Sequence, residues 1–478
     1  MSTDVTYKNN TLASISSGTG TLKTAGKYLE DDITITVTGS GGGEPARKKQ
    51  INFIDYDGII LYSYTKSEWQ NVSDLPDNPS HDGLIAQGWN WTKAQIDAQL
   101  TAMPDGDIWV GQMYITDDGK TRIYIHLTQG RLHPYFGIRL DGTVIVDWGD
   151  NSATSTMTSS AAYTIYRDHE YASEGDYVIT ITVSSGSFRF YGGNQSTILR
   201  TDINSNRIEC DIVYLNAIQK IEFGEGIYRF DYDAFHSCQS LKSITTPSNV
   251  TTVSGFAFQD CYSLESITIP SGVTGIGLNE FTECYSLASI SIPSSVRTIN
   301  NEAFSYCYSL ASITIPSGVT SFGNSVFWGC HSLLSISIPS GVTQIETKTF
   351  DDCYSLTSVA IPSSVTRFCS YAFFNCRSLK SITIPSGVTV IESYAFDECH
   401  SLTIVTIPSS VTDIGNSAFS HCYGVAEYHV LRSTPPTLGS YAFASIADDC
   451  KIYVPSASRY TYQQATNWST YQAKIVGE

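Results

Sequence analysis

Nine cysteines recur at a constant interval of 23 residues in the second half of the chain: Cys238, Cys261, Cys284, Cys307, Cys330, Cys353, Cys376, Cys399 and Cys422. A constant period of this length is typical of a solenoid, in which each coil repeats the coil before it. A catalytic site needs no such spacing. The sequence therefore predicts a long stacked surface, and we look for function on that surface rather than in a pocket.

The aligned copies share the pattern A-F-x-x-C-x-S-L-x-S-I-T-I-P-S-x-V-T-x-I. Alternating apolar residues indicate a short strand with one face in the core, and the proline ends the strand because it lacks an N–H for the next coil. We expect Ser312 and Thr314 to belong to a flat polar face that is solvated or lines a ligand. The residues of one copy expected to point inward are Phe304, Cys307, Leu310, Ile313, Ile315, Val319 and Phe322.

The cysteines are expected to form a ladder of reduced thiols. Neighbouring coils lie about 4.8 Å apart, which is within disulfide range. Stacked copies point the same way, however, and a cysteine in a core behaves as a small hydrophobe. No Cys-x-x-Cys pair or histidine-rich cluster accompanies the ladder, so we predict no metal site and no cofactor.

The array has distinct ends. In the first coil Leu215 takes the place of the cysteine, and the pattern decays after Pro435-Pro436. A strand at residues 451–455 and a helical stretch that includes Trp468 then follow. We expect this tail to cap the last coil, because a stacked array needs capped ends.

The positions next to the cysteine vary most between copies. Stacking would place equivalent residues in rows, and rows of Tyr, His and Arg present flat amphipathic faces suited to recognising a sugar or a protein. The competing interpretation is that these side chains cap the coil edge and shield the strand backbone. The candidate ligand-binding residues are Tyr262, Tyr285, Tyr306, Tyr308, Trp328, His331, Tyr354, Phe374, Arg377, His400 and Tyr423.

These copies resemble the BspA-like leucine-rich repeats of bacterial surface proteins. The resemblance rests on the strand, the Ile-Pro corner and the Ala-Phe-x-x-Cys segment, and it covers roughly residues 215–430. The Tyr-Val-Pro and Asn-Trp-Ser of the tail also look like the usual ending of that family. The resemblance implies a binding scaffold and not an enzyme.

Residues 136–195 look like a separate module. The run at 146–150, Val-Asp-Trp-Gly-Asp, is similar to PKD-type β-sandwich domains, although Asn151 stands where that family usually has glycine. The resemblance implies a spacer or adhesive module. Asp147, Asp150 and Asn151 are candidate Ca²⁺ ligands, but we favour the alternative that these residues form a turn.

Residues 50–135 combine short helices and strands. Thr92 is a suitable N-cap for a helix that ends before Pro104. Residues 109–115 and 122–127 are predicted to form a hairpin around an Asp-Asp-Gly turn. The sequence thus predicts a small α+β module here.

Charge and composition exclude several classes of function. The net charge of −18 argues against wrapping nucleic acid or binding an anionic membrane. The first ten residues have no basic stretch or apolar run, so no secretory signal is predicted, and no stretch is long and apolar enough for a membrane span. His126 and His133 are candidate catalytic groups, but no nucleophile or carboxylate pair stands in an assignable relation to them, so no catalytic site is predicted.

The front of the chain resembles another class of protein. Residues 24–28, Thr-Ala-Gly-Lys-Tyr, and the block at 53–124 resemble segments of tail proteins from phages and prophages of gut bacteria. This resemblance implies that residues 1–38 attach to phage tail components, followed by a Gly-rich linker. It also offers a route out of the cell that needs no secretion signal, since virions leave by lysis.

Taken together, the sequence predicts a mainly β, multidomain chain whose leucine-rich-repeat solenoid follows a PKD-like β-sandwich and a small α+β module. The first functional hypothesis is a phage tail or tail-fibre-tip protein that binds a glycan or protein receptor on the bacterial surface, trimeric by analogy with tail fibres. The alternative is a bacterial cell-surface adhesin of the BspA type. The predicted segments are 1–38 for attachment, 39–49 linker, 50–135 α+β module, 136–195 PKD-like module, 196–430 repeats and 431–478 cap.

Overall fold

The structure, a computed structural model, describes residues 18–22, 33–37, 50–103, 107–190, 198–200 and 215–478. The chain divides into two compact units, residues 1–48 and 49–478. In the first unit, β1 (Gly18–Leu22) pairs in antiparallel fashion with β2 (Ile33–Val37). The predicted attachment segment is β-rich to this extent, while residues 24–28 and the linker lie outside the described residues.

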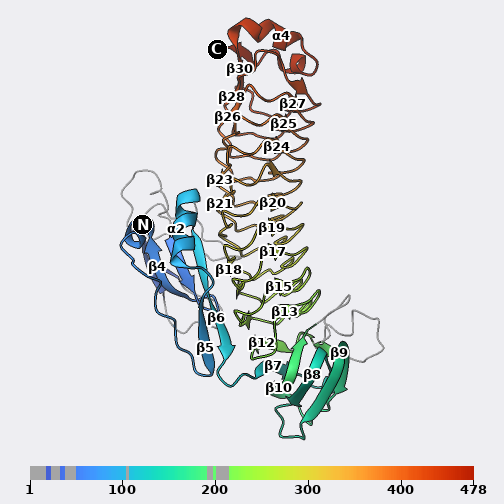
Figure 1. The fold of residues 1–478 in the computed structure, drawn as a ribbon. Coiled ribbons are helices and arrows are strands. Elements are labelled where there is room, and N and C mark those ends of the chain that lie inside the picture. Colours follow the sequence, from blue (N-terminus) through green and yellow to red (C-terminus); the bar gives the residue numbers. More distant parts are fainter. Residues whose placement is uncertain (1–17, 23–32, 38–49, 104–106, 191–197, 201–214) are drawn as a thin grey trace. The chain divides into compact units, whose positions relative to one another are not determined.

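The second unit contains the solenoid, whose coils follow one another from green to red in Figure 1. Strands of adjacent coils that carry the S-I-T pattern pair in parallel in several separate groups, because two such coils offer each other the same backbone groups in register. These strands are β14 (Ser243–Ile244), β16 (Ser266–Thr268), β18 (Ser289–Ser291), β21 (Ser335–Ser337), β23 (Ser358–Ala360), β26 (Ile404–Ile407) and β28 (Glu427–Val430).

A second row of two-residue strands follows the proline corner and also pairs in parallel. These are β13 (Arg229–Phe230), β15 (Thr252–Val253), β17 (Gly275–Ile276), β19 (Thr298–Ile299), β20 (Ser321–Phe322), β22 (Gln344–Ile345), β24 (Arg367–Phe368), β25 (Val390–Ile391), β27 (Asp413–Ile414) and β29 (Thr437–Leu438). On the third side, the Ala-Phe-x-x-Cys turns are linked directly, as where the Phe304 N–H donates to Val326 O at 3.0 Å.

The core is a set of side-chain ladders. Each phenylalanine of the Ala-Phe pair stacks on its equivalents, and Phe304 lies 5.6 Å from Phe281 and 5.7 Å from Phe327 between ring centroids. The nine periodic cysteines are free and buried. From Cys261 onward each Sγ donates to the carbonyl of the phenylalanine 26 residues earlier, as Cys307 does to Phe281 O at 3.2 Å. The inward orientation of the predicted thiol ladder is therefore confirmed.

Each coil contains two residues in the left-handed region of backbone space. One precedes the Ala-Phe pair and the other precedes the cysteine, for example Glu302 (φ 55°) and Tyr306 (φ 60°). A non-glycine residue with positive φ is uncommon and costs conformational energy. The positive φ recurs in each coil because it orients the backbone N–H groups of these residues toward carbonyls of the next coil, as where the Glu302 N–H donates to Asn324 O.

Glu280 occupies the position before phenylalanine that is alanine in most copies, and its side chain is fully buried. Its Oε2 accepts from the Gly277 N–H, but its Oε1 has no partner. Burial raises the pKa of this carboxyl well above its ordinary value of 4.5. Since the folded chain binds this proton more tightly than the unfolded chain does, the contribution of Glu280 to stability is most favourable at acid pH and declines as the pH rises above 4.5.

Glu280→Gln is expected to raise the free energy of unfolding by about 1–3 kcal/mol at pH 8, because a neutral amide needs no proton to be buried. At pH 4, where Glu280 is protonated in both states, the two proteins should be equally stable. Urea unfolding at both pH values measures the difference. An equal effect of the substitution at pH 4 and pH 8 would contradict this account.

The strands that precede the solenoid extend its sheet. They are β7 (Thr121–Leu127), β8 (Tyr135–Asp147), β9 (Ser155–Asp168), β10 (Gly175–Arg189) and β11 (Leu199–Arg200), and they run in the order β11-β8-β10-β7-β12, with β9 paired to β8. The first solenoid strand, β12 (Ile218–Glu222), is antiparallel to β7 and parallel to β14. The sheet therefore covers the open edge of the first coil, which would otherwise expose unpaired backbone groups.

This pairing corrects one prediction. Residues 109–115 and 122–127 do lie in strands, but they do not form a hairpin with each other. β7 pairs instead with β10 and β12, because the edge of the first coil offers it a long-range partner that a local turn signal cannot reveal. The PKD-like assignment of residues 136–195 stays a prediction.

Residues 50–116 form a second sheet in the order β4-β3-β6-β5. Its elements are β3 (Gln50–Ile54), β4 (Ile60–Thr65), α1 (Lys66–Trp69), β5 (Leu84–Trp89), α2 (Lys93–Ala102) and β6 (Ile108–Thr116). Thr92 caps α2 with a reciprocal capping box, which confirms the predicted helix start. The aromatic and aliphatic core of this sheet includes Phe53, Trp69 and Trp91.

This small sheet packs against the S-I-T strands of the early coils. The Trp109 indole donates to Ser312 Oγ at 3.0 Å and its backbone N–H donates to Thr314 Oγ1 at 3.0 Å. The Trp91 indole donates to Ile292 O at 2.9 Å. Ser312 and Thr314 are therefore buried, and the expectation that they face solvent or a ligand is wrong. Equivalent residues of later coils, such as Ser358 and Thr406, are exposed.

The tail caps the last coil as predicted. β30 (Lys451–Val454) and β31 (Ile475–Gly477) continue the strand row beyond β28. Between them lie η1 (Ser456–Ser458), α4 (Arg459–Gln464) and η2 (Trp468–Tyr471). The buried Trp468 indole donates to Pro436 O at 2.8 Å and packs on Phe443, the last ring of the phenylalanine ladder.

Candidate ligand-binding surface on the solenoid

The residues that follow the cysteines form a continuous column. Tyr262, Tyr285 and Tyr308 stack face to face with centroids 4.7 and 4.8 Å apart. His331 lies 4.6 Å from Tyr308 and 4.6 Å from Tyr354 on its other side. The geometry follows from the repeat itself, since parallel pairing sets equivalent positions about 4.8 Å apart, close to the stacking distance of two rings.

The upper part of the column is looser. The Arg377 guanidinium carbon lies 5.3 Å from the Tyr354 centroid, in cation–π range. His400 and Tyr423 lie 5.1 Å apart with their planes tilted by 41°. Tyr423 is 53 % exposed, so the last ring of the column offers solvent most of its surface.

The stacking changes what this surface can present. Tyr285, Tyr308 and His331 have a neighbouring ring against each face, so these faces are not open to a sugar, contrary to the expected flat binding platforms. The rings are nevertheless partly exposed. What the column presents to solvent is a row of ring edges with polar tips, repeated once per coil.

A carboxylate accompanies several of these rings, two residues earlier in the chain. The Tyr285 hydroxyl donates to Glu283 Oε2, and the His400 Nε2 lies 2.7 Å from Glu398 Oε2. Burial, together with the bond to Glu283, raises the pKa of Tyr285. The carboxylates therefore hold the rings in position and give the edge of the column a negative charge.

The residues before the cysteines form a second aromatic group. Tyr306 lies 4.7 Å from Trp328, and 6.1 Å from Tyr308, so the group adjoins the column. The Lys348 ammonium lies 4.5 Å from the Trp328 centroid. Phe374 packs edge-on to Tyr371 at 5.5 Å rather than on the other predicted residues.

Sequence reasoning missed some members of this surface. Tyr371 and Tyr394 stack at 4.7 Å, and Lys348 lies in the same row one coil earlier. All three occupy the position before the Ala-Phe pair, which also varies between copies. Attention to every variable position, and not only to those next to the cysteine, would have found them.

The other candidate groups form local pairs. His126 Nδ1 lies 2.8 Å from Asp176 and His133 Nε2 lies 3.4 Å from Asp168, each on the surface. In the turn at 147–152, Asp150 accepts from the Ser152 N–H and lies 2.7 Å from His169 Nε2. Although burial alone would raise the pKa of Asp150, these bonds hold it at about 2. The geometry is that of a turn-forming acid.

Comparison with known proteins places the repeat in a family. The BspA type leucine rich repeat region matches residues 206–334 and 323–448. No curated protein matches the sequence. Within the part of the chain that the structure describes, no helix combines the length and apolar character needed to cross a membrane.

Several solved structures are similar. A leucine-rich repeat protein from Bacteroides ovatus is 20% identical, with 62% of this chain and 97% of that chain covered and a TM-score of 0.38. A leucine rich cell surface protein from Faecalibacterium prausnitzii is 24% identical, with 55% and 90% covered and a TM-score of 0.32. The leucine rich repeat protein of T. pallidum is 27% identical, with 43% and 83% covered and a TM-score of 0.28.

The family match spans slightly more than half of the chain, and the residues it covers form the parallel strand rows and the phenylalanine and cysteine ladders described above. The chain therefore belongs to the BspA type leucine-rich repeat family.

Proposed function

We propose that this protein is a non-enzymatic bacterial cell-surface adhesin and that the aromatic column is its receptor-binding edge. The observation that carries the proposal is the uninterrupted stack from Tyr262 to Tyr354, in which each coil contributes one partly exposed ring. Rigid aromatic side chains are favoured at binding sites because they bury a large area at a low cost in conformational entropy. A receptor glycan or protein segment would lie along the column and bond to its polar ring edges.

We favour a cell-surface adhesin over a phage tail protein because the chain carries the repeats of the BspA type family. The phage tail hypothesis has no support beyond the resemblance of the front segments. The two candidates share the same binding edge but differ in where the protein is found. Antibody labelling of intact producing cells supports the adhesin. Co-purification with phage particles, and absence from the cell surface, would favour the tail protein.

Tyr→Phe substitution at Tyr285, Tyr308 and Tyr354 together is expected to weaken retention on receptor-bearing cells by about tenfold or more. Each lost hydroxyl removes a hydrogen bond of about 0.5–1.5 kcal/mol to the receptor, and 1.4 kcal/mol corresponds to tenfold in affinity. The phenyl rings keep the stack. The internal bond from the Tyr285 hydroxyl to Glu283 is lost, but it lies at a partly exposed edge, so the midpoint of thermal unfolding should change little. Retention is scored by flow cytometry of the labelled protein on panels of bacterial and epithelial cells, and on isolated wall glycans.

The matched control is Tyr→Phe at Tyr163 and Tyr460, which are 70 % and 75 % exposed but lie outside the column and the rows beside it. This control should bind like the unchanged protein. The same three residues are also replaced by serine, and the stability of that variant is measured. If the Tyr→Phe variant binds as well as the unchanged protein and the serine variant loses stability, the column only packs the coil edge.

A further inference from the structure

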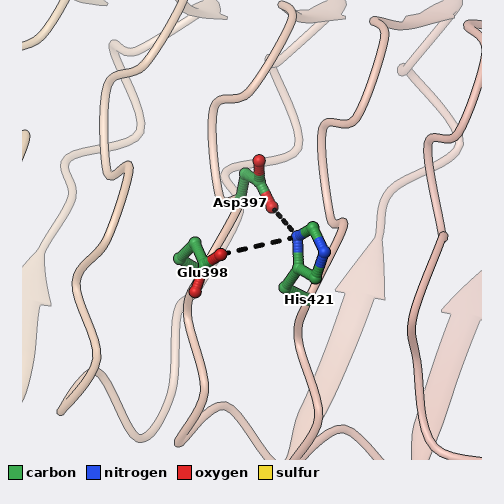
Figure 2. A group of neighbouring side chains, drawn as sticks. All are labelled: Asp397, Glu398 and His421. Carbon is green, nitrogen blue, oxygen red and sulfur yellow. Dashed lines mark hydrogen bonds and ion pairs between the residues drawn. The ribbon is translucent and has the colours of Figure 1, made fainter.

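We propose that Asp397, Glu398 and His421 form a binding site for a divalent transition-metal ion, with Zn²⁺ as the best fit. Figure 2 shows the two carboxylates and the imidazole converging from adjacent coils. One ligand atom from each residue lies within 4.8 Å of the other two. This site adjoins the column at His400 and Tyr423, but its existence does not depend on the receptor-binding proposal.

The distances suit a metal with a short coordination radius. His421 Nδ1 lies 2.9 Å from Asp397 Oδ1 and 3.6 Å from Glu398 Oε1. Ligands of a tetrahedral zinc ion, each about 2.0–2.2 Å from the metal, are separated by about 3.4 Å from one another. The observed spacings lie on either side of this value, so small side-chain rotations would bring all three atoms to one ion.

The hydrogen bonding of the cluster leaves negative charge uncompensated. His421 Nδ1 faces Asp397, Glu398 and, at 3.0 Å, the Ser420 hydroxyl. A single N–H can donate to only one of these acceptors at full strength. Asp397 is in addition only 6 % exposed, and water can offset little of its charge there. A divalent cation bound by all three side chains would supply the missing compensation.

The repeat contains its own comparison. Two coils earlier, Asp351, Asp352 and Asn375 occupy the positions of Asp397, Glu398 and His421. There the Asn375 amide donates to Asp352 Oδ1 at 2.6 Å, and Lys348 lies 3.9 Å from Asp351. In that coil the two acids therefore face an amide and an ammonium in place of an imidazole. Of these two coils, the later one places an imidazole, the common nitrogen ligand of zinc, with a single nitrogen against both carboxylates.

His400 is placed to orient Glu398, one of the three proposed ligands. Glu398 Oε2 lies 2.7 Å from His400 Nε2, while its Oε1 faces His421. Carboxylates that ligate a metal are usually hydrogen-bonded through their other oxygen, which fixes their orientation. We therefore expect Asp397, Glu398 and His421 to bind the ion directly, with water as the remaining ligand. His400 would fix the orientation of Glu398 through a hydrogen bond without touching the ion.

The test compares zinc binding by the full chain and by two variants, using ZnCl₂ in calorimetry and in competition with a chromogenic chelator. The unchanged protein should bind one zinc ion saturably in the micromolar range. His421→Asn copies the earlier coil and should remove that ion. The double substitution Lys348→Tyr/Asn375→His copies the later coil and should create a second site, raising the stoichiometry from one to two.

Folding is checked by far-UV circular dichroism and by the thermal midpoint without zinc, so that a loss of binding by an unfolded variant is not counted. Zinc should also raise the midpoint of the unchanged protein but not that of His421→Asn. Equal zinc binding by the unchanged protein and His421→Asn, or no saturable binding by either, would overturn the proposal.

Discussion

Phe304→Ala is expected to lower the free energy of unfolding by about 3–5 kcal/mol, the usual cost of truncating a fully buried aromatic side chain. The ring has no exposed surface and lies between Phe281 and Phe327 in the ladder. Backbone hydrogen bonds along the Ala-Phe turns and the second strand row fix the spacing of neighbouring coils, so the coils cannot close over the space left by the ring. The cavity therefore remains in the variant, and the free energy of unfolding is lowered by the full cost of that cavity.

Urea unfolding measures the total loss, and hydrogen exchange locates it. Because each coil contacts mainly its neighbours, the amides of the coils around Phe304 should lose the most protection. Phe374→Ala is the matched control, since Phe374 is an aromatic residue of the same turns but is partly exposed, and it should cost less than about 1 kcal/mol. Similar losses in both variants would contradict the ladder as the main support of the core.

Asn90→Leu is expected to release the small sheet of residues 50–116 from the solenoid. The buried Asn90 amide donates to Ile269 O at 2.9 Å and to Ser291 O at 3.3 Å. Its Oδ1 accepts from the Gly111 N–H and from the Ser291 hydroxyl, each at 2.9 Å. Leucine fills a similar volume but removes the partner of the buried Gly111 N–H and of Ile269 O, at about 1–3 kcal/mol for each. Ser291 keeps its bonds to Trp109 O and to the Ile269 N–H.

Hydrogen exchange and limited proteolysis would report the release as faster exchange in β5, β6 and the strands they cover. Gly111 lies close enough to Thr268 that a Cβ atom would stand 2.0 Å from its Oγ1, so the contact tolerates little rearrangement. Asn71→Leu, at an exposed position, is the control and should leave exchange in these strands unchanged. Unaltered protection in Asn90→Leu would mean that Trp91 and Trp109 suffice to hold the sheet in place.

The sequence predicted the solenoid well because its information is local and repeated. Cys307 and Phe304 have equivalents at the same phase in almost every copy, so a single alignment identifies the core and the rows on the surface. The stack through Tyr285 and Tyr308 follows directly, since a fixed period and parallel pairing leave equivalent side chains nowhere else to lie.

The parts that could not be predicted depend on long-range contacts. The burial of Ser312 follows from its meeting with Trp109, about two hundred residues earlier in the chain, and no periodicity records that meeting. β7 was assigned to a hairpin for the same reason. The grouping of Asp397, Glu398 and His421 was not foreseen because Asp397 and His421 come from different coils, so their proximity becomes visible only when the coils are stacked with side chains in place.

The left-handed residues limit how the row beside the aromatic column can diversify. In all described copies with a regular turn, the residue before the cysteine is drawn from Ser, Asp, Glu, Tyr, Gly, Asn and His, with no Val, Ile or Thr. Branching at Cβ clashes with the backbone at positive φ. Variants of this scaffold with new specificities, whether natural or selected from a library, should therefore not carry Val, Ile or Thr at the position before the cysteine.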